Sequence, residues 1–198
     1  MLRRGIFLNH PGRKSGLTLV EMLVALGIAA ALLAMALPSM SKFIARQRLV
    51  GVASELASDL RYARSEQMKA SRPMRIGFAS NAAKTCYMVH NFIQFTSCSC
   101  ARSARPYCSA FTPGAPVPTE LKTVDLPASD QVSVRPLTGT PSALVFESTT
   151  GLAISAVKLT IDVQSTLGGH LRVLTGAAGQ PSICSVSGHA PRFPACPT

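Results

Sequence analysis

The sequence predicts an α+β protein in which one long N-terminal helix is followed by a domain of antiparallel β-strands. Three observations lead to this fold class. Residues 17–41 are almost uncharged, the next segment repeats apolar side chains at helical spacing, and the chain after Pro73 is a series of short alternating runs. We expect a leader over 1–16, a membrane-spanning helix over 17–41, an amphipathic helix over 42–72 and a β-rich domain over 73–198.

Residues 17–41 have the length and apolarity to cross a membrane. These 25 residues contain one charged side chain, that of Glu21. As a helix they measure about 37 Å, at roughly 1.5 Å per residue, against a bilayer core of about 30 Å. Pro38 removes one backbone hydrogen bond, so we expect it to bend or loosen the helix.

Glu21 is the exception in this apolar run, and it needs a partner. A carboxylate in hydrocarbon costs about 2.5–3.5 kcal/mol on the milder insertion scales. No basic residue lies within one helical turn of Glu21. We expect the N-terminal ammonium of a neighbouring subunit to neutralise it, which would favour a fixed axial stagger between subunits.

The residues around this acid form a recognisable pattern, in which Arg13-Lys14-Ser15-Gly16 precedes Leu17-Thr18-Leu19-Val20-Glu21. The pattern resembles the class III signal of type IV pilins and pseudopilins. The resemblance implies that a prepilin peptidase cuts between Gly16 and Leu17 and methylates the new amine of Leu17. It also implies that Glu21 takes part in subunit pairing and that Pro38 is the helix-loosening proline of many pilins. Many members begin with Phe or Met, so Leu17 is a mild departure.

Two other interpretations of the N-terminus stay open. An ordinary secretory signal would be cleaved after Ala36, and a plain membrane anchor would keep Met1. N-terminal sequencing separates the three, because the chain would start at methylated Leu17, at Leu37 or at Met1.

The helix should continue beyond the apolar run to about Ala70. Apolar side chains recur at helical spacing and form one stripe that packs on the domain: Leu49, Val52, Ala53, Leu56, Leu60 and Ala63. Polar and charged residues are expected off the stripe: Arg48, Glu55, Asp59, Tyr62, Glu66 and Lys69. Pro73 ends the helix, because the residue before a proline avoids helical angles.

After Pro73 the pattern is that of strands. A hairpin is expected from 74–79 and 86–92, joined by a polar turn over 80–85. Further short strands are expected at 121–126, 131–135, 143–147, 157–163 and 170–174. The clean alternation of 157–163 predicts one buried and one exposed face. Residues 96–119, rich in Cys, Pro and Ser, show no periodicity and are predicted to form a long loop that is stapled or used in an interaction.

One long helix followed only by strands, with Leu144-Val145-Phe146-Glu147 leading through a glycine turn to a last hairpin, resembles the GspH/FimT pseudopilin family. The resemblance implies a pilin-like fold and a minor structural subunit of a type II secretion pseudopilus or a type IV pilus. It implies a single-pass inner-membrane protein with its domain in the periplasm, assembled into a periplasmic or surface filament. The implied partners are other pilins or pseudopilins, the prepilin peptidase and the inner membrane, with a secreted substrate or DNA as further candidates.

Six cysteines in an exported chain indicate disulfides. Cys184 and Cys196 bracket a terminal loop, and a bond between them would contribute about 3 kcal/mol by the loop-closure estimate. The four cysteines that remain allow three pairings: Cys86, Cys98, Cys100 and Cys108.

The mature chain is basic. Without the leader, 16 basic and 9 acidic side chains leave a charge of +7, which permits contact with anionic lipid or nucleic acid. Some FimT-like proteins are DNA receptors for natural transformation and carry a Gly-Arg-x-Arg element near the C-terminus. The corresponding place here reads Gly188-His189-Ala190-Pro191-Arg192, which keeps the glycine and one displaced arginine. Lys158, Arg172 and Arg192 are the candidate phosphate contacts, and a solvated surface loop is the alternative.

No enzyme motif is recognisable, and we expect no catalytic residue and no cofactor. The sequence has no Gly-x-Ser-x-Gly elbow, no metal-binding helix motif and no phosphate loop. A metal site made of Cys98, Cys100, Cys108 and His90 is an alternative to disulfides, but zinc sites usually have wider cysteine spacing. We therefore expect no metal.

Overall fold

The computed structural model describes residues 16, 18–94, 96–110, 113–114, 116–147, 159–176, 179–186 and 192–197, with the backbone alone for 35–39. The chain divides into two compact units, Met1–Met40 and Ser41–Thr198. The predicted leader up to Ser15, Leu17, Lys158 and most of the Gly188–Arg192 element lie outside the described residues.

A single helix, α1 (Leu19–Ala70), supplies residues to both units. The side-chain hydroxyl of Thr18 accepts a hydrogen bond of 3.2 Å from the backbone N–H of Glu21, which caps the first turn. The helix ends at Ala70, as predicted. Ser71 then takes a positive φ of 49°, and Pro73 follows before the first strand.

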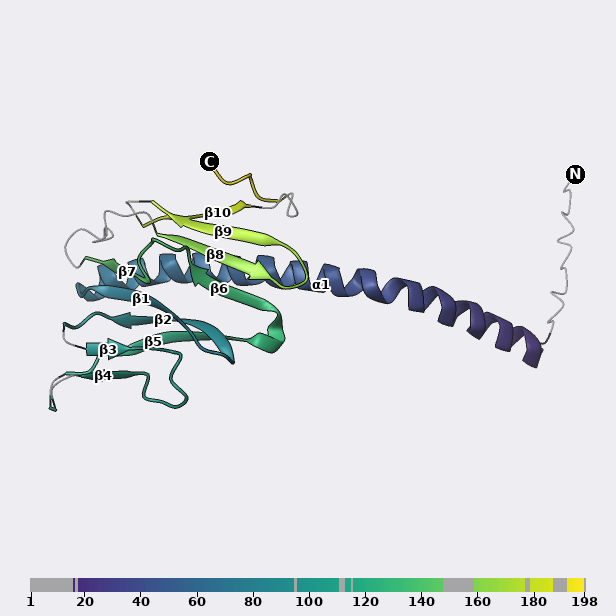
Figure 1. Cartoon of the computed structure of the whole chain (residues 1–198), viewed down its shortest axis with the longest axis horizontal. Helices are drawn as coiled ribbons and strands as arrows, with labels where there is room; N and C mark the ends of the chain where they lie inside the picture. Colours follow the sequence, from purple (N-terminus) through teal and green to yellow (C-terminus); the bar gives the residue numbers. More distant parts are fainter. Residues whose placement is uncertain are drawn as a thin grey trace, which may run out of the picture. The chain divides into compact units, whose positions relative to one another are not determined.

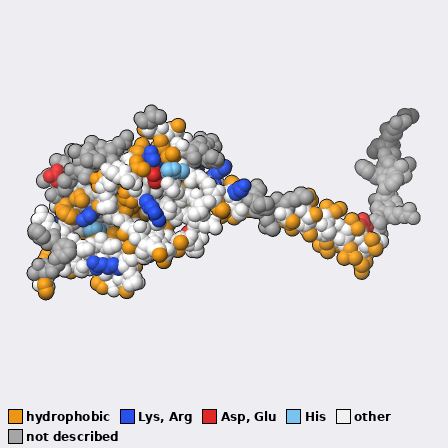
Figure 2. All heavy atoms as spheres, viewed as in Figure 1, with side chains coloured by type: hydrophobic (Ala, Val, Ile, Leu, Met, Phe, Trp, Pro, Cys, Tyr) orange, Lys and Arg blue, Asp and Glu red, His pale blue; other side chains and the backbone are white. Residues whose placement is uncertain are grey.

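Hydrophobic side chains are exposed along the described part of α1 in the first unit, where Figure 2 shows them in orange. They include Leu19, Val20, Leu23, Val24, Leu26 and Leu32. Within the described residues, no helix combines the length and the apolarity that a membrane span requires. The span expected for 17–41 therefore stays a prediction, as does the loosening of the helix at Pro38.

The second unit contains two four-stranded antiparallel sheets (Figure 1). The first has the order β5-β2-β1-β7 and consists of β1 (Met74–Ser80), β2 (Lys84–Asn91), β5 (Glu120–Pro127) and β7 (Ala143–Phe146). The second has the order β10-β9-β8-β6 and consists of β6 (Val132–Pro136), β8 (Thr160–Ser165), β9 (His170–Thr175) and β10 (Pro181–Ser185). A short hairpin of β3 (Thr96–Cys98) and β4 (Cys108–Ala110) and a 3₁₀ turn, η1 (Ala128–Asp130), complete the described elements.

One hydrophobic core is shared by both sheets and by α1 within the second unit. All six residues of the predicted stripe are buried, so that prediction is confirmed. Tyr87, Phe146 and Ile161 are among the strand residues that pack against them. A buried hydrogen bond of 3.2 Å from the Val134 N–H to the Thr85 hydroxyl links β6 of the second sheet to β2 of the first.

The predictions for 96–119 and 157–163 are corrected by the structure. Residues 96–119 contain the β3–β4 hairpin, whose three-residue strands are too short to show a period of two. The exposed face expected in 157–163 is not found in β8, where residues 160–163 are all buried, because the neighbouring side chains of β9 cover Asp162.

Asp59 was predicted to lie off the apolar stripe, and it is nevertheless buried. It is only 5% exposed. Its carboxylate is buried because Tyr87 and Lys122, from two strands of the first sheet, hydrogen-bond to it.

Candidate functional site

The N-terminal motif places Glu21 in the first turn of a capped helix. Gly16 and Glu21 are both exposed, while Leu17 between them lies outside the described residues. Among the described residues, no cation lies within ion-pair distance of the Glu21 carboxylate. The positive end of the helix dipole favours an acid at this position. The carboxylate is therefore stabilised locally and is open to an external partner.

Thr18 has a capping role that was not predicted from the sequence. Thr18 and Glu21 have the Ser/Thr-x-x-Glu spacing of a capping box, in which the threonine side chain satisfies the backbone N–H at the glutamate. This spacing is the signal that would have identified it. The Thr and the Glu of the motif thus act together on the start of the helix.

A group of polar side chains, of which Asp59 and Tyr87 are buried, fastens the second half of α1 to the first sheet. The Tyr87 hydroxyl donates to Asp59 at 2.8 Å, and the Lys122 ammonium donates to Asp59 at 2.8 Å and to Glu55 at 2.9 Å. Burial, reinforced by Asp59, raises the pKa of Tyr87, so the hydroxyl keeps its proton. Desolvation opposes the charge of Lys122, but its hydrogen bonds to Asp59 and Glu55 outweigh this and raise its pKa. We call these four residues the helix anchor.

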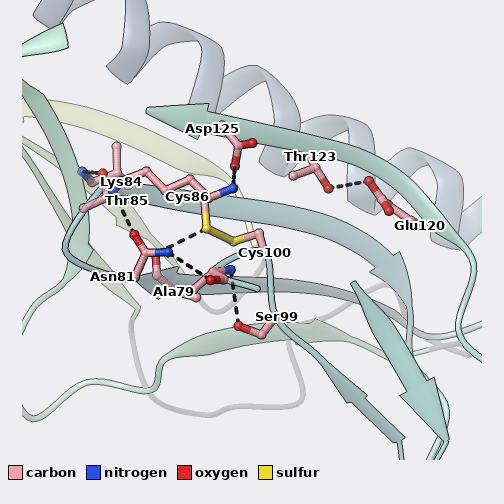
Figure 3. The surroundings of a disulfide bond; sticks show 12 residues. Ala79, Asn81, Lys84, Thr85, Cys86, Ser99, Cys100, Glu120, Thr123 and Asp125 are labelled. Atoms are coloured by element: carbon pink, nitrogen blue, oxygen red, sulfur yellow. Dashed lines mark hydrogen bonds and ion pairs between the residues drawn. A yellow bond between two sulfur atoms is a disulfide. The ribbon is translucent and has the colours of Figure 1, made fainter. Parts of the chain in front are cut away.

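All six cysteines form disulfides: Cys86–Cys100, Cys98–Cys108 and Cys184–Cys196. The last pair is the one expected from the sequence, and the first two select one of the three pairings left open. Figure 3 shows Cys86 of β2 bonded to Cys100 in the segment after β3. Beside this disulfide, Lys84 reaches Asp125 of β5 at 2.8 Å, and the Asn81 amide donates to the Ala101 carbonyl at 2.9 Å. The hairpin is thus held against the first sheet.

His90 lies beside this hairpin, as the metal alternative required. A ring nitrogen of His90 and the Sγ atoms of Cys98 and Cys108 all lie within 4.8 Å of one another. The sulfurs of Cys98 and Cys108 form one disulfide, and Cys100 forms another with Cys86. None of these three cysteines is therefore a thiolate that would bind zinc. The Nδ1 atom of His90 lies 2.9 Å from the Asn91 carbonyl, and burial lowers the pKa of the imidazole. In this oxidised state the donor set does not fit a metal.

The three candidate phosphate contacts differ in whether they are ion-paired, exposed or outside the described residues. Arg172 on β9 pairs with Asp162 of β8 at 2.8 Å, and His170 lies 3.1 Å from the same oxygen. Arg192 is exposed, and Lys158 lies outside the described residues. On the face of the second unit that Figure 2 shows, Lys and Arg form separate spots rather than a continuous stripe. Arg172 is therefore not a free cation on this surface.

Two family models match the chain. Residues 11–37 match the prokaryotic N-terminal methylation motif, and residues 52–179, more than half of the chain, match the type II transport protein GspH. The chain belongs to the GspH family. This GspH-family chain is thus a protein of the minor pilin and pseudopilin class with a prepilin methylation motif.

Two solved structures are similar to this GspH-family chain, and both are crystal forms of the type IV minor pilin FimU from Pseudomonas aeruginosa. One is 17% identical and covers 70% of this chain and 89% of its own, with a TM-score of 0.48. The other is 16% identical and covers 67% of this chain and 90% of its own, with a TM-score of 0.45. None of the curated proteins matches significantly.

Proposed function

We propose that this chain is a minor pseudopilin, a structural subunit of a type II secretion pseudopilus or of a type IV pilus. One observation carries the proposal: a prepilin methylation motif over 11–37 and a GspH domain over 52–179 occur in the same chain. The exposed Glu21 carboxylate at the capped start of α1 has no cation beside it within the described residues, which suits a subunit that pairs through this acid.

The proposed mechanism starts with cleavage between Gly16 and Leu17, which creates a new amine four residues before Glu21. A second subunit that enters the membrane bundle meets Glu21 with its own amine. Because a lone carboxylate in hydrocarbon costs about 2.5–3.5 kcal/mol, the axial position that joins the two charges is favoured. The helix anchor then keeps the β domain attached to the helix that is drawn into the filament.

Substitutions at Glu21 test this mechanism, with Thr18 as the matched control. Glu21→Gln removes the charge and keeps the shape, whereas Thr18→Ala removes the cap and keeps the charge. We expect Glu21→Gln to be processed and methylated, as measured by mass spectrometry, but to be lost from sheared filaments or from crosslinked subunit pairs. Thr18→Ala should still assemble. If Glu21→Gln assembles normally, or if Thr18→Ala fails equally, charge pairing is not the cause.

Deletion and complementation decide which machine the subunit serves. Loss of protein secretion with normal piliation assigns it to a type II pseudopilus, and the reverse assigns it to a type IV pilus. An inner-membrane location with a periplasmic domain is part of the same proposal. Protease accessibility of the second unit in spheroplasts, compared with intact cells, tests it.

DNA binding for natural transformation is the alternative function, and the observation that favours it is the exposed position of Arg192. A gel-shift assay with the full chain in maltoside detergent at low salt tests it. Affinity that falls in the Arg192→Ala variant, and that stays unchanged in Arg46→Ala, would support DNA contact. Absence of a shift at low salt removes this alternative.

A further inference from the structure

A cavity of about 350 Å³ lies in the second unit between α1 and the turn that joins β9 to β10. Its lining consists of Arg61 and Arg64 from α1 and of Gly179, Gln180 and Pro181 from the turn and the start of β10. None of these residues belongs to the N-terminal motif, the helix anchor or the disulfide-bonded hairpin.

In the part of the chain that the structure describes, the two arginines lack a counter-charge. At positions i and i+3 they lie on one side of the helix, one turn apart. Among the described residues, no carboxylate pairs with either of them, whereas Arg48 pairs with Asp130 and Arg172 pairs with Asp162. The Nε atom of Arg64 is buried and has no hydrogen-bond partner. A buried guanidinium N–H without an acceptor is costly, so an acceptor bound in the cavity would stabilise Arg64.

The opposite wall of the cavity is held in place by packing. Gly179 has a φ of 68°, and a Cβ atom there would collide with Cε1 of the buried Phe146, so Gly179 lies directly on the core. The Gly179 N–H donates to the Gly176 carbonyl at 2.8 Å, and the Gly176 N–H donates to the Gln180 carbonyl at 3.3 Å. The cavity is therefore formed before any ligand binds.

We propose that this cavity binds an oxyanion, a carboxylate or a phosphate group, through the guanidinium groups of Arg61 and Arg64. Guanidinium groups donate paired N–H bonds that match the spacing of carboxylate and phosphate oxygens. The volume is at the lower end of the range for small-ligand sites, which suits a small anion or one charged group of a larger molecule. The site is independent of filament assembly through Glu21.

The test uses the full chain in maltoside detergent, which carries no competing anion. The ¹⁵N–¹H signals of the arginine Nε groups are followed during titration with inorganic phosphate and, separately, with acetate at constant ionic strength. We expect a saturable shift of the Arg64 signal with one of the two anions, which identifies the class of oxyanion. The Arg46 signal, from an exposed arginine of the same helix, should show no saturable shift.

Substitutions of the two arginines test their part in binding. Arg61→Ala changes an exposed residue, so it should leave the fold intact and weaken binding by about tenfold. Arg64→Lys keeps the positive charge but loses the paired N–H donors of the guanidinium group, so it should also weaken binding. The control variant Arg46→Ala should bind like the unaltered chain. Non-saturable shifts shared by all arginines, or equal affinity in Arg61→Ala, would overturn the site. Assembly of the Arg61→Ala chain into filaments tests the independence from Glu21.

Discussion

The hydroxyl of Tyr87 on β2 donates a hydrogen bond of 2.8 Å to the carboxylate of Asp59 on α1, and both residues are buried. This bond connects two residues 28 positions apart and crosses the interface between the helix and the first sheet. Lys122 approaches the same carboxylate from β5, so the buried charge has two donors. A buried carboxylate is tolerated only with such partners.

Removal of the Tyr87 hydroxyl should therefore destabilise the second unit. We expect Tyr87→Phe to lower the free energy of unfolding by about 1–3 kcal/mol, because the buried Asp59 side chain loses a hydrogen-bond donor. Denaturant unfolding of the chain in mild detergent measures this. Tyr62→Phe is the control, since Tyr62 is 38% exposed, and it should change the value by less than about 0.5 kcal/mol. Equal effects of the two substitutions would contradict the role of the bond.

The three disulfides predict a defined thiol count. The oxidised chain should show no free thiol, and six should appear after reduction in denaturant. Peptide mapping by mass spectrometry should recover Cys86–Cys100, Cys98–Cys108 and Cys184–Cys196. Replacement of both Cys184 and Cys196 by serine should cost about 3 kcal/mol, since the bond closes a loop of 12 residues in the unfolded chain.

His90 predicts loss of stability in acid. Burial lowers its pKa in the folded chain, so the imidazole stays neutral there, while the unfolded chain has the ordinary value of about 6.5. As the pH falls below about 6.5, the unfolded chain binds a proton that the folded chain excludes. The free energy of unfolding should therefore fall between about pH 7 and pH 5. His90→Gln should reduce this slope, and an unchanged slope in that variant would disprove the assignment.

Two glycines of one turn form a matched pair for substitution. An alanine at Gly179 would meet Phe146 and would also need a positive φ, whereas at Gly176 its Cβ has open space. We expect Gly179→Ala to destabilise the unit by about 1–3 kcal/mol, and Gly176→Ala to have little effect. Thermal unfolding of the two variants side by side measures the difference. Equal melting temperatures would show that Gly179 does not pack directly on Phe146.

The helix and most strands could be predicted from the sequence, because their signals are local. The stripe from Leu49 to Ala63 and the proline after Ala70 depend only on spacing and backbone geometry. The strands β5, β6, β7 and β9 lie within one or two residues of the predicted ranges. β10 was not predicted, because its five residues begin with proline and show no clear alternation.

The sites were harder to predict, because they depend on residues far apart in the sequence. The spacing places Asp59 beside the apolar stripe, but it does not show that Tyr87 and Lys122 approach its carboxylate. In the same way, the cavity at Arg61 and Arg64 exists because the β9–β10 turn lies opposite the helix. The pairing of the four middle cysteines likewise follows from the place of the β3–β4 hairpin beside β2.

The C-terminal segment returns to the free side of β10. Ala195 forms a parallel bridge with Ser185, the Ser185 N–H donates to the Pro194 carbonyl at 2.8 Å, and the Cys184–Cys196 bond locks the segment there. The unpaired backbone groups of an edge strand can pair with the edge strand of another molecule, and a high local concentration favours this pairing. Because its own C-terminal segment covers this edge of β10, the protein offers one edge strand fewer for amyloid-like stacking where many copies lie close together.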